Sequence, residues 1–382
     1  MRKRIWLPLL VLVLASAGLL ALPRARPVTF DGGYRNCRAR VLEVDASAVE
    51  RTGLVDYGTE KLRVELLDGP DSGRVFAAEN ELRAQPDIDK RFAVGDIALV
   101  ACPPGELADD CILDARDHWR LGRAAALFVA FAVLLVAFSG LTGLSALFSF
   151  VFSCLAVWKL LIPLCLDGWN PLWTTFLTVC LLTAVIMYLV AGATRKGLAA
   201  FLGAMLGIVA SLALSCVSCS GMHVTGATMP YVQALVYAGC SSLDILSVFN
   251  GAVILASSGA VMDLAMDIAA GMAEVRRHIP NLPRFELFRS GMRIGRSVVG
   301  TMTTTLLLAY SGGYLTLLMV FAAQGTHPVD FINSTLVSAE IVKTLVGSFG
   351  LVLVAPFTAL VSSWVYKNAE AASRSARARS RS

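Results

Sequence analysis

The stretch ILSVFNGAVILASSGAVM, residues 245–262, contains no charged side chain, and DLAMDIAAGMAEVRRH, residues 263–278, follows it directly. An apolar run of this length is close to the roughly 20 residues that a helix needs to cross a bilayer. The next stretch begins with Asp263 and has Asp267 four residues later, so the sequence predicts a membrane helix that carries two acids. The full run, residues 244–275, is too long for one straight crossing and must be kinked, broken or extended beyond the bilayer.

The composition of the 382-residue chain is typical of a membrane protein, because 56% of the residues are hydrophobic and 16% are charged. A soluble domain is about a quarter charged. The net charge of +5 is modest, and no basic stripe with interleaved aromatic residues is present, so we expect no nucleic-acid binding. The chain has no P-loop, HExxH motif or nucleophile elbow, so we expect neither an enzyme nor a cofactor.

Apolar runs predict an α-helical polytopic membrane protein with about eight transmembrane helices. The first, residues 1–23, begins with three basic residues ahead of its apolar run and is expected to be a signal anchor, with a cleaved signal peptide as the alternative. Seven further runs lie in a helical membrane domain, residues 119–366, before a basic tail, residues 367–382. These runs are residues 121–140, 144–166, 171–193, 198–218, 244–275, 297–323 and 335–366.

Residues 24–118 differ from the rest because apolar and polar residues alternate there. Alternation with a period of two is typical of half-buried strands. We therefore expect a small β domain, a five-stranded barrel of the OB or SH3-like type. Cys102 and Cys111 flank a short loop, and a disulfide between them is plausible outside the cell. Cys37 would then have no disulfide partner.

The distribution of basic residues predicts the orientation in the membrane. Lysines and arginines that lie in short loops mark the cytoplasmic side. Arg195 and Lys196, the arginine-rich residues 276–296 and the tail all fall on one side, whereas residues 167–170, 219–229 and 324–334 carry no Lys or Arg. We expect both termini in the cytoplasm and the β domain on the extracytoplasmic side.

Asp263 and Asp267 are the first candidates for function, because residues i and i+4 share one face of a helix. A carboxylate at the bilayer centre costs roughly 2.5–3.5 kcal/mol on insertion scales, so intramembrane acids are usually functional. This face, near Gly259, would then bind an ion, a proton or a basic partner. Alternatively, both acids lie at the cytoplasmic interface, where they are solvated or paired with Arg276 and Arg277.

A second polar region lies in GMRIGRSVVGTMTTTLLLAYSGG, residues 291–313. Thr301 and Thr305 share a face, and the pair that starts at Gly312 interrupts the predicted span, which suggests a polar lining. Threonine hydroxyls also bond back to their own helix, which is the alternative. Arg296 at the cytoplasmic mouth could neutralise an aspartate, but we favour an anchoring role.

A third region combines Cys216, Cys219 and His223 in SCVSCSGMHV, residues 215–224. Thiolate and imidazole ligands suit a soft metal such as copper(I), and the CxxC spacing also suits thiol exchange. The alternative is structural, because cysteine often serves as a small hydrophobic residue in a helix.

Several of these motifs together resemble the YibE/F-like family of bacterial multi-pass membrane proteins. They are LLIPLCLDGWNP, GAVMDLAMDIAAGMAEV, GMRIGRSVVGTMTTTLLLAYSGG and EIVKTLVGSFGLVLVAPFTAL, in this order. The resemblance extends from about Cys37 to Trp364 and is most specific in the last third. It singles out Gly259, Asp263, Arg296 and Thr301, and it implies a bacterial cytoplasmic membrane.

Three functions are compatible with the sequence. We rank first a secondary transporter or exporter of a small solute or ion, coupled to protons or cations through the two aspartates. Second is a membrane-anchored sensor or envelope assembly factor, in which the β domain binds a partner or a second copy of the chain. Third is thiol-redox or soft-metal handling at the CxxC motif.

Overall fold

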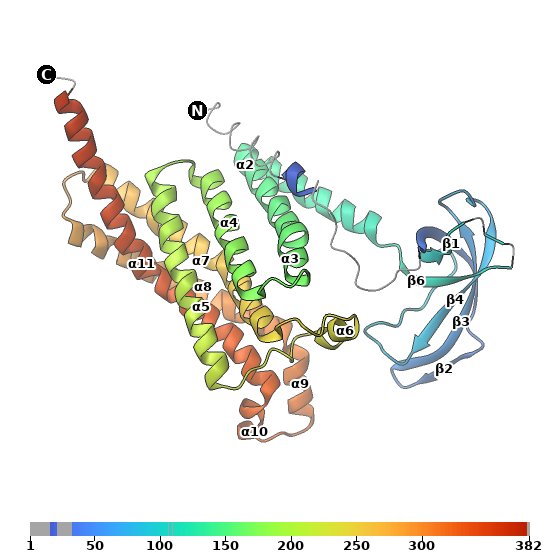
Figure 1. The fold of residues 1–382 in the computed structure, drawn as a ribbon. Coiled ribbons are helices and arrows are strands. Elements are labelled where there is room, and N and C mark those ends of the chain that lie inside the picture. The colour runs from blue at the N-terminus through green and yellow to red at the C-terminus, as the bar shows by residue number, and fades with distance from the viewer. Residues whose placement is uncertain (1–15, 21–32, 106, 109, 380–382) are drawn as a thin grey trace. The chain divides into compact units, whose positions relative to one another are not determined.

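The structure of the protein is a computed structural model. It describes residues 16–20, 33–105, 107–108 and 110–379, without side chains for residues 367–379 (Figure 1). The chain divides into two compact units, Pro27–Leu134 and, as the second unit, Met1–Arg26 together with Leu135–Ser382. The predicted anchor at residues 1–23 lies outside the described residues except for residues 16–20, which are helical.

The first unit contains a closed five-stranded barrel, which confirms the barrel predicted from the alternating pattern. The strand order is β1-β5-β6-β4-β3, and β3 pairs back with β1, while β2 extends the far edge of β3. Neighbouring strands are antiparallel except for β4 and β6, which run parallel (Figure 1). The strands are β1 Arg35–Asp45, β2 Val49–Thr52, β3 Val55–Leu66, β4 Val75–Arg83, β5 Ile97–Cys102 and β6 Ile112–His118.

The barrel closes through β1, which pairs with β5 over residues 35–40 and with β3 over residues 39–45. A bulge between Val41 and Glu43 shifts the register of β1 against β3. An extra residue bends a strand and increases its twist, so this bulge lets β1 belong to both sides of the barrel. Apolar side chains alternate inward from every strand and fill the core, among them Cys37, Ala39, Val41, Leu62, Val64, Leu66, Phe76, Ala78, Val100, Cys102 and Leu113.

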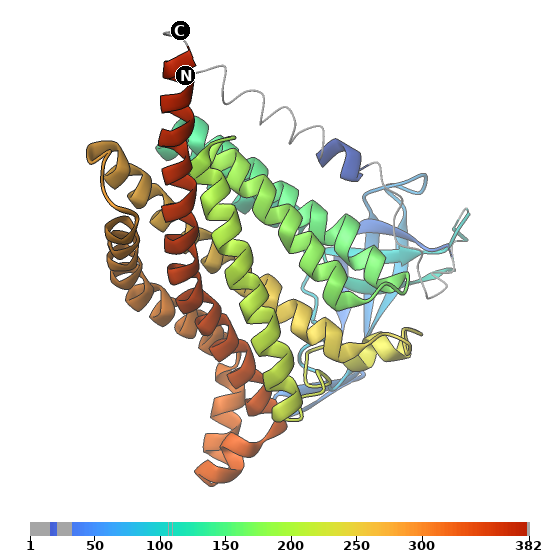
Figure 2. The same cartoon turned by 60° about the vertical axis from the view of Figure 1, so that its left-hand side comes forward.

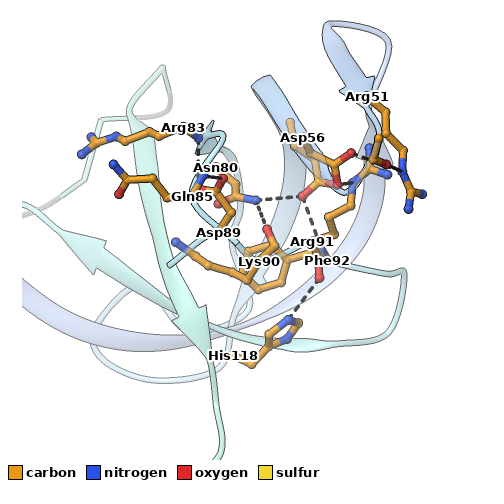
Figure 3. A network of polar contacts seen from close by, with 12 residues as sticks. Arg51, Asp56, Asn80, Arg83, Gln85, Asp89, Lys90, Arg91, Phe92 and His118 are labelled. Atoms are coloured by element: carbon orange, nitrogen blue, oxygen red, sulfur yellow. Dashed lines mark hydrogen bonds and ion pairs between the residues drawn. The ribbon is translucent and has the colours of Figure 1, made fainter. Parts of the chain in front are cut away.

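One acidic side chain is part of the barrel interior. Glu60 on β3 is 2% exposed, and its Oε2 accepts hydrogen bonds from Asn80 Nδ2 at 3.0 Å and from the Phe92 backbone N–H at 3.2 Å. Asn80 Nδ2 also donates to the Lys90 carbonyl at 2.6 Å, as Figure 3 shows. Burial of a carboxyl group without such partners is strongly unfavourable, so this network holds residues 86–92 against the barrel.

The second unit is a bundle of long helices (Figures 1 and 2). Asn170, Thr194 and Asp244 cap α4, α5 and α7 by accepting hydrogen bonds from backbone N–H groups of the first turn. Short polar side chains favour this position because they satisfy donors that the helix leaves unpaired. The helices are α2 Leu121–Ala156, a π-helical segment Val157–Leu161, α3 Ile162–Leu166, α4 Pro171–Ala191, α5 Arg195–Gly221, α6 Val232–Tyr237, α7 Ile245–His278, α8 Arg284–Gly313, α9 Leu315–Ala323, α10 Pro328–Asn333 and α11 Thr335–Arg379.

Five helices of the described residues are long and apolar enough to cross a membrane, or six if the bent pair of α8 and α9 forms one span. The predicted count of eight is therefore not confirmed. The predicted spans at residues 121–140 and 144–166 form one helical run, Leu121–Leu166, in which Gly140 has φ 57° and ψ −131°. Glycine adopts such a conformation at little cost, so the run changes direction without a loop.

The predicted span at residues 297–323 is divided between α8 and α9. Their axes differ by 62°, with the bend at Tyr314 between the two helices. The glycine pair at Gly312 and Gly313 ends α8 at this point, as the sequence suggested. The described residues therefore contain either a broken span or a re-entrant segment here.

The central helix of the bundle is α7, which contacts α4, α5, α8 and α11. Small residues bring α5 and α11 close together, because a Cβ atom at Gly203 would overlap Thr358 and one at Gly207 would lie 3.0 Å from Val354 Cβ. Membrane helices use small residues in this way to increase packing contacts and to bring backbones together. The bundle core thus combines close helix contacts at glycines with large buried side chains such as Leu264, Ile268 and Met272.

Candidate functional site

Asp263 and Asp267 lie on α7, which is one uninterrupted helix from Ile245 to His278. The over-long apolar run is therefore explained by a continuous helix and not by a break. An α-helix rises about 1.5 Å per residue, so α7 is roughly 50 Å long and exceeds the hydrocarbon thickness of a bilayer. The helix is therefore longer than one crossing of the hydrocarbon region requires.

The contacts of α7 locate the two acids along the bundle. Val261 Cγ1 would lie 3.2 Å from a Cβ atom at Gly207. Gly207 is about 12 residues, or roughly 18 Å, from the start of α5 at Arg195. Asp263 is therefore near the middle of the bundle. Asp267 lies about one turn closer to the end with the connection between α7 and α8, which we call the basic turn because Arg276, Arg277 and Arg284 flank it.

Both acids belong to a narrow exposed face of an otherwise buried helix. Ile254, Leu264 and Ile268 on the other sides of α7 are fully buried. A Cβ atom at Gly259 would meet no other atom within 4 Å, so this glycine makes no close contact among the described residues. We call this face the acid stripe, and it consists of Ala252, Ala256, Gly259, Asp263 and Asp267.

The partners considered from the sequence are engaged elsewhere. Arg277 pairs with Glu274 at 2.5 Å, and Arg276 Nη1 donates to the Leu282 carbonyl at 2.7 Å. Within the described part of the chain, neither aspartate of the acid stripe forms a hydrogen bond or an ion pair. The carboxylates are thus available to an ion or a proton.

Arg296 lies on α8 at the level of the acid stripe. The residue before it, Gly295, faces α7, because a Cβ atom there would lie 3.3 Å from Ile268 Cδ1. Arg296 itself is exposed. No ion pair joins it to Asp263 or Asp267 among the residues that the structure describes.

The threonines selected from the sequence are not turned into the bundle. Thr301 and Thr305 are exposed, and their hydroxyls donate to carbonyls of the same helix, those of Val298 at 2.9 Å and Thr301 at 3.0 Å. Gly312 also has no atom near its Cβ position. The alternative interpretation, that these hydroxyls satisfy their own helix, describes their hydrogen bonds.

Two other polar side chains of α8 do turn inward: Thr303, one of the four threonines that suggest a polar lining, and Tyr310, which sequence reasoning missed. The Thr303 and Tyr310 hydroxyls are buried and have no hydrogen-bond partner among the described residues. Tyr310 Oη would lie 3.3 Å from a Cβ atom at Gly347 on α11. Their spacing of seven residues, about two helical turns, places both on one face of α8. The spacing does not show whether that face packs against other helices.

The structure gives the two cysteines of the CxxC region different surroundings. Cys219 is 2% exposed and lies 3.4 Å from Asn250 Oδ1, whereas Cys216 is half-buried. His223 and Cys219 line an open cleft of about 550 Å³ together with Asp244. Within the described residues, no three His, Cys, Asp or Glu side chains form a group that could hold a metal ion.

Asn250 on α7 is a buried polar residue that the sequence analysis did not single out. Its Oδ1 accepts a hydrogen bond from Ser215 Oγ at 2.5 Å, and its Nδ2 donates to the Leu246 carbonyl at 3.1 Å. A buried amide needs such partners, so Asn250 links α5 to α7 in the half of the bundle away from the basic turn. Cys219 therefore belongs to a helix-packing network.

The cysteines of the barrel are free thiols in the structure, so the predicted disulfide between Cys102 and Cys111 is not formed there. Cys102 is fully buried, and Cys37, also buried, is its hydrogen-bonding neighbour. Register explains this arrangement, because Cys37 pairs with Val100 and both cysteines therefore point into the barrel from adjacent strands. Burial, followed by the Cys37 contact, raises the pKa of Cys102 to about 12.

Comparison with known proteins identifies a family. The family model described as YibE/F-like protein matches residues 127–368, more than half of the chain and all of the candidate residues on α5, α7 and α8. No curated protein and no solved structure matches the chain.

Proposed function

The chain belongs to the YibE/F-like family, and from the acid stripe we propose that this membrane protein is a secondary transporter whose coupling proton or cation binds at Asp263 and Asp267. The observation that carries the proposal is that two carboxyl groups, one turn apart, lie near the middle of the bundle without a partner among the described residues.

The energetics support this function. A carboxylate costs several kcal/mol in the hydrocarbon region unless it is protonated, paired or in contact with water. Side chains at i and i+4 have Cβ atoms about 6 Å apart, so two carboxyl groups on one helix face can share a proton or bind one cation. Uptake and release of that proton or cation would couple solute movement to an ion gradient.

The proposed orientation follows from the basic residues. Arg195 and the first turn of α8 lie at the end of the bundle toward which Asp267 is displaced. If that end faces the cytoplasm, as the rule for basic loops predicts, both termini are cytoplasmic and the barrel is extracytoplasmic. The acid stripe then opens toward the inner half of the bacterial cytoplasmic membrane.

Carbodiimide labelling tests whether the acids titrate inside the membrane. Dicyclohexylcarbodiimide modifies protonated carboxyl groups in apolar surroundings, so we expect labelling of Asp263 or Asp267 that decreases as the pH rises. We also expect that one ion of a panel of Na⁺, K⁺ and Mg²⁺ protects the site. Peptide mass spectrometry of the full chain in proteoliposomes measures this.

Flux measurements test the transport step with a matched control on the same helix. We expect Asp263→Asn and Asp267→Asn to abolish pH changes of an entrapped dye when a gradient of the protecting ion is imposed. Glu274→Gln should leave the signal unchanged, because Glu274 is exposed and paired with Arg277. Normal flux in both aspartate variants would refute the proposal.

A second function is favoured by one feature of the barrel. Leu54 is 90% exposed at the turn between β2 and β3, and Tyr57 on the same hairpin is 65% exposed. Without β2, the barrel order is first, second, third, fifth and fourth strand, an OB-type arrangement that many binding domains use. We propose that this hairpin binds an envelope partner or a second copy of the chain.

Site-specific photo-crosslinking in cells tests the hairpin. A photoreactive residue at Leu54 should give one defined cross-linked product, and the same residue at the exposed Glu81 on β4 should not. Equal products from both positions, or none from Leu54, would count against this function.

A further inference from the structure

A cavity of about 370 Å³ lies where the turn between α7 and α8 meets α11. It is separate from the acid stripe and from the cleft at Cys219, and it does not depend on the transport function. Its polar lining comes from four parts of the chain, the last turn of α7, the turn that follows it, the first turn of α8, and α11. The polar lining residues are Arg276, Asn281, Arg284 and Ser363.

The charge of this cavity is positive. Two of its side chains are guanidinium groups, and none of its described lining residues is acidic. Among the described side chains, the two acids on these helix turns are engaged elsewhere, because Glu274 pairs with Arg277 and His278, and Glu286 pairs with Arg289. Arg276 also donates from Nη1 to the Leu282 carbonyl in the cavity wall. A guanidinium group offers several N–H donors in a planar fork that matches the oxygens of a phosphate or carboxylate.

One donor at the cavity has no acceptor. Arg284 Nε is buried and makes no hydrogen bond within the described residues. The guanidinium carbon lies 5.0 Å from the ring centroid of Trp364, a contact that holds the side chain in place. A buried donor without an acceptor is costly, so an oxygen ligand beside Arg284 would remove an unfavourable feature of the structure.

The start of α8 adds to the positive potential. The helix has 30 residues, and no side chain caps its first turn, where Pro283 is the N-cap residue. The unpaired N–H groups of a helix N-terminus carry partial positive charge and favour anions. Here they accompany two guanidinium groups, so two features favour an anion, while Glu286, the acid of the first turn, is paired with Arg289.

The apolar residues in the cavity wall indicate which class of anion fits. Leu287, 1% exposed, forms part of its wall together with Pro283, so apolar surface lies beside the guanidinium groups. Trp364 is 58% exposed at the same end of the bundle, which is typical of side chains at a membrane interface. Such a site suits an oxyanion, and its apolar wall also leaves room for an organic group attached to that oxyanion.

We propose that this cavity, the arginine cavity, binds a phosphate-class oxyanion through Arg276, Arg284 and Asn281. The phosphate of an anionic lipid headgroup and a free phosphate share this chemistry. In the first case the site anchors the turn between α7 and α8 to the membrane surface. In the second it binds a soluble anion at the end of the bundle that carries the basic turn.

Two binding measurements on the delipidated full-length protein in detergent distinguish the sources. The first follows radiolabelled inorganic phosphate by equilibrium dialysis. The second uses native mass spectrometry with phosphatidylglycerol, and with phosphatidylcholine as the zwitterionic reference. A phosphate signal alone assigns a soluble anion, and retention of phosphatidylglycerol over phosphatidylcholine assigns a lipid headgroup.

Matched variants distinguish binding in the cavity from a general effect of positive charge on anion binding. Arg284→Gln should weaken binding of the preferred probe on the order of tenfold, because a charge-assisted hydrogen bond is lost. Arg289→Gln removes the same charge from the same helix at an exposed position outside the cavity lining, and should change binding less than twofold. Asn281→Ala, in the exposed loop, should weaken binding several-fold without affecting the fold.

The proposal is overturned if Arg284→Gln and Arg289→Gln bind both probes alike. It is also overturned if wild-type protein binds neither phosphate nor phosphatidylglycerol above the phosphatidylcholine reference. If Arg284→Gln does not fold, Asn281→Ala decides, and unchanged binding in that variant refutes the site.

Discussion

Tyr366 Oη donates a hydrogen bond of 2.7 Å to the backbone carbonyl of Ala269, which lies 97 residues earlier in the chain. Both residues are buried, and the bond joins α11 to α7 about half a turn beyond Asp267. The helix that carries the acid stripe is therefore held on its buried side by α11. Its opposite face, the acid stripe, is exposed among the described residues.

Tyr366→Phe should lower the free energy of unfolding by about 1 kcal/mol, because the variant loses one buried hydrogen bond and keeps the ring. Tyr237→Phe is the matched control, since Tyr237 is 86% exposed. Thermal unfolding in detergent, followed by circular dichroism, measures the difference. Equal midpoints for the two variants would show that the bond does not stabilise the bundle.

Gly203→Ala should destabilise the bundle by about 1–3 kcal/mol, because the added methyl group overlaps Thr358 and forces α5 away from α11. Gly300→Ala on α8 adds the same group where no atom lies within 4 Å. That control should be neutral or slightly stabilising, since alanine favours a helix over glycine. If Gly203→Ala unfolds at the same temperature as Gly300→Ala, the close contact is not required.

Asn80→Ala should destabilise the barrel by about 2 kcal/mol, because it removes two hydrogen bonds and leaves the buried Glu60 with fewer donors. Asn36→Ala is a suitable control, since the contact from Arg116 to Asn36 is exposed and 3.4 Å long. Limited proteolysis of the full chain within residues 86–92 reports the loss. Unchanged protection of that loop in Asn80→Ala would contradict the role given to the network.

Alkylation of Cys102 should depend strongly on pH. Burial raises the pKa of this thiol from its ordinary value of 9.0 to about 12, and the thiolate is the reactive form. Iodoacetamide should therefore label Cys102 slowly at pH 8 in folded protein and rapidly after denaturation, as peptide mass spectrometry can show. Fast labelling of the folded protein at pH 8 would contradict the buried position.

The same shift affects stability at alkaline pH. The folded pKa lies above the unfolded one, so the unfolded state releases the proton first as the pH rises. The stabilisation from the protonated thiol is complete below about pH 9 and is lost progressively toward pH 12. The unfolding midpoint should fall across this window, and Cys102→Ala should make the fall smaller.

Most elements could be predicted from local sequence patterns. The run of residues 245–262 predicts a helix because a backbone in lipid must satisfy its own hydrogen bonds. The alternation in VFAAENELR predicts β4, with its side chains alternately buried and exposed. The number of spans was harder, because nothing in the sequence around Gly140 shows whether a glycine ends a helix or bends it.

The site was only partly predictable. The four-residue spacing of Asp263 and Asp267 places both on one face of any helix. The sequence did not show that Thr301 and Thr305 are exposed while Thr303 and Tyr310 point inward. That difference depends on which side of α8 packs against α7 and α11, and on residues far apart in the chain.

By itself, the sequence determined the membrane class, the barrel and the paired acids, because these follow from hydrophobicity and from the periods of helix and strand. The tertiary structure decided that α7 is continuous, that Cys102 lies beside Cys37, and that Arg276 and Arg284 line one cavity. The physical reason is that helix and strand periods act over neighbouring residues. Contacts between distant segments depend on the packing of whole elements, and no local pattern records them.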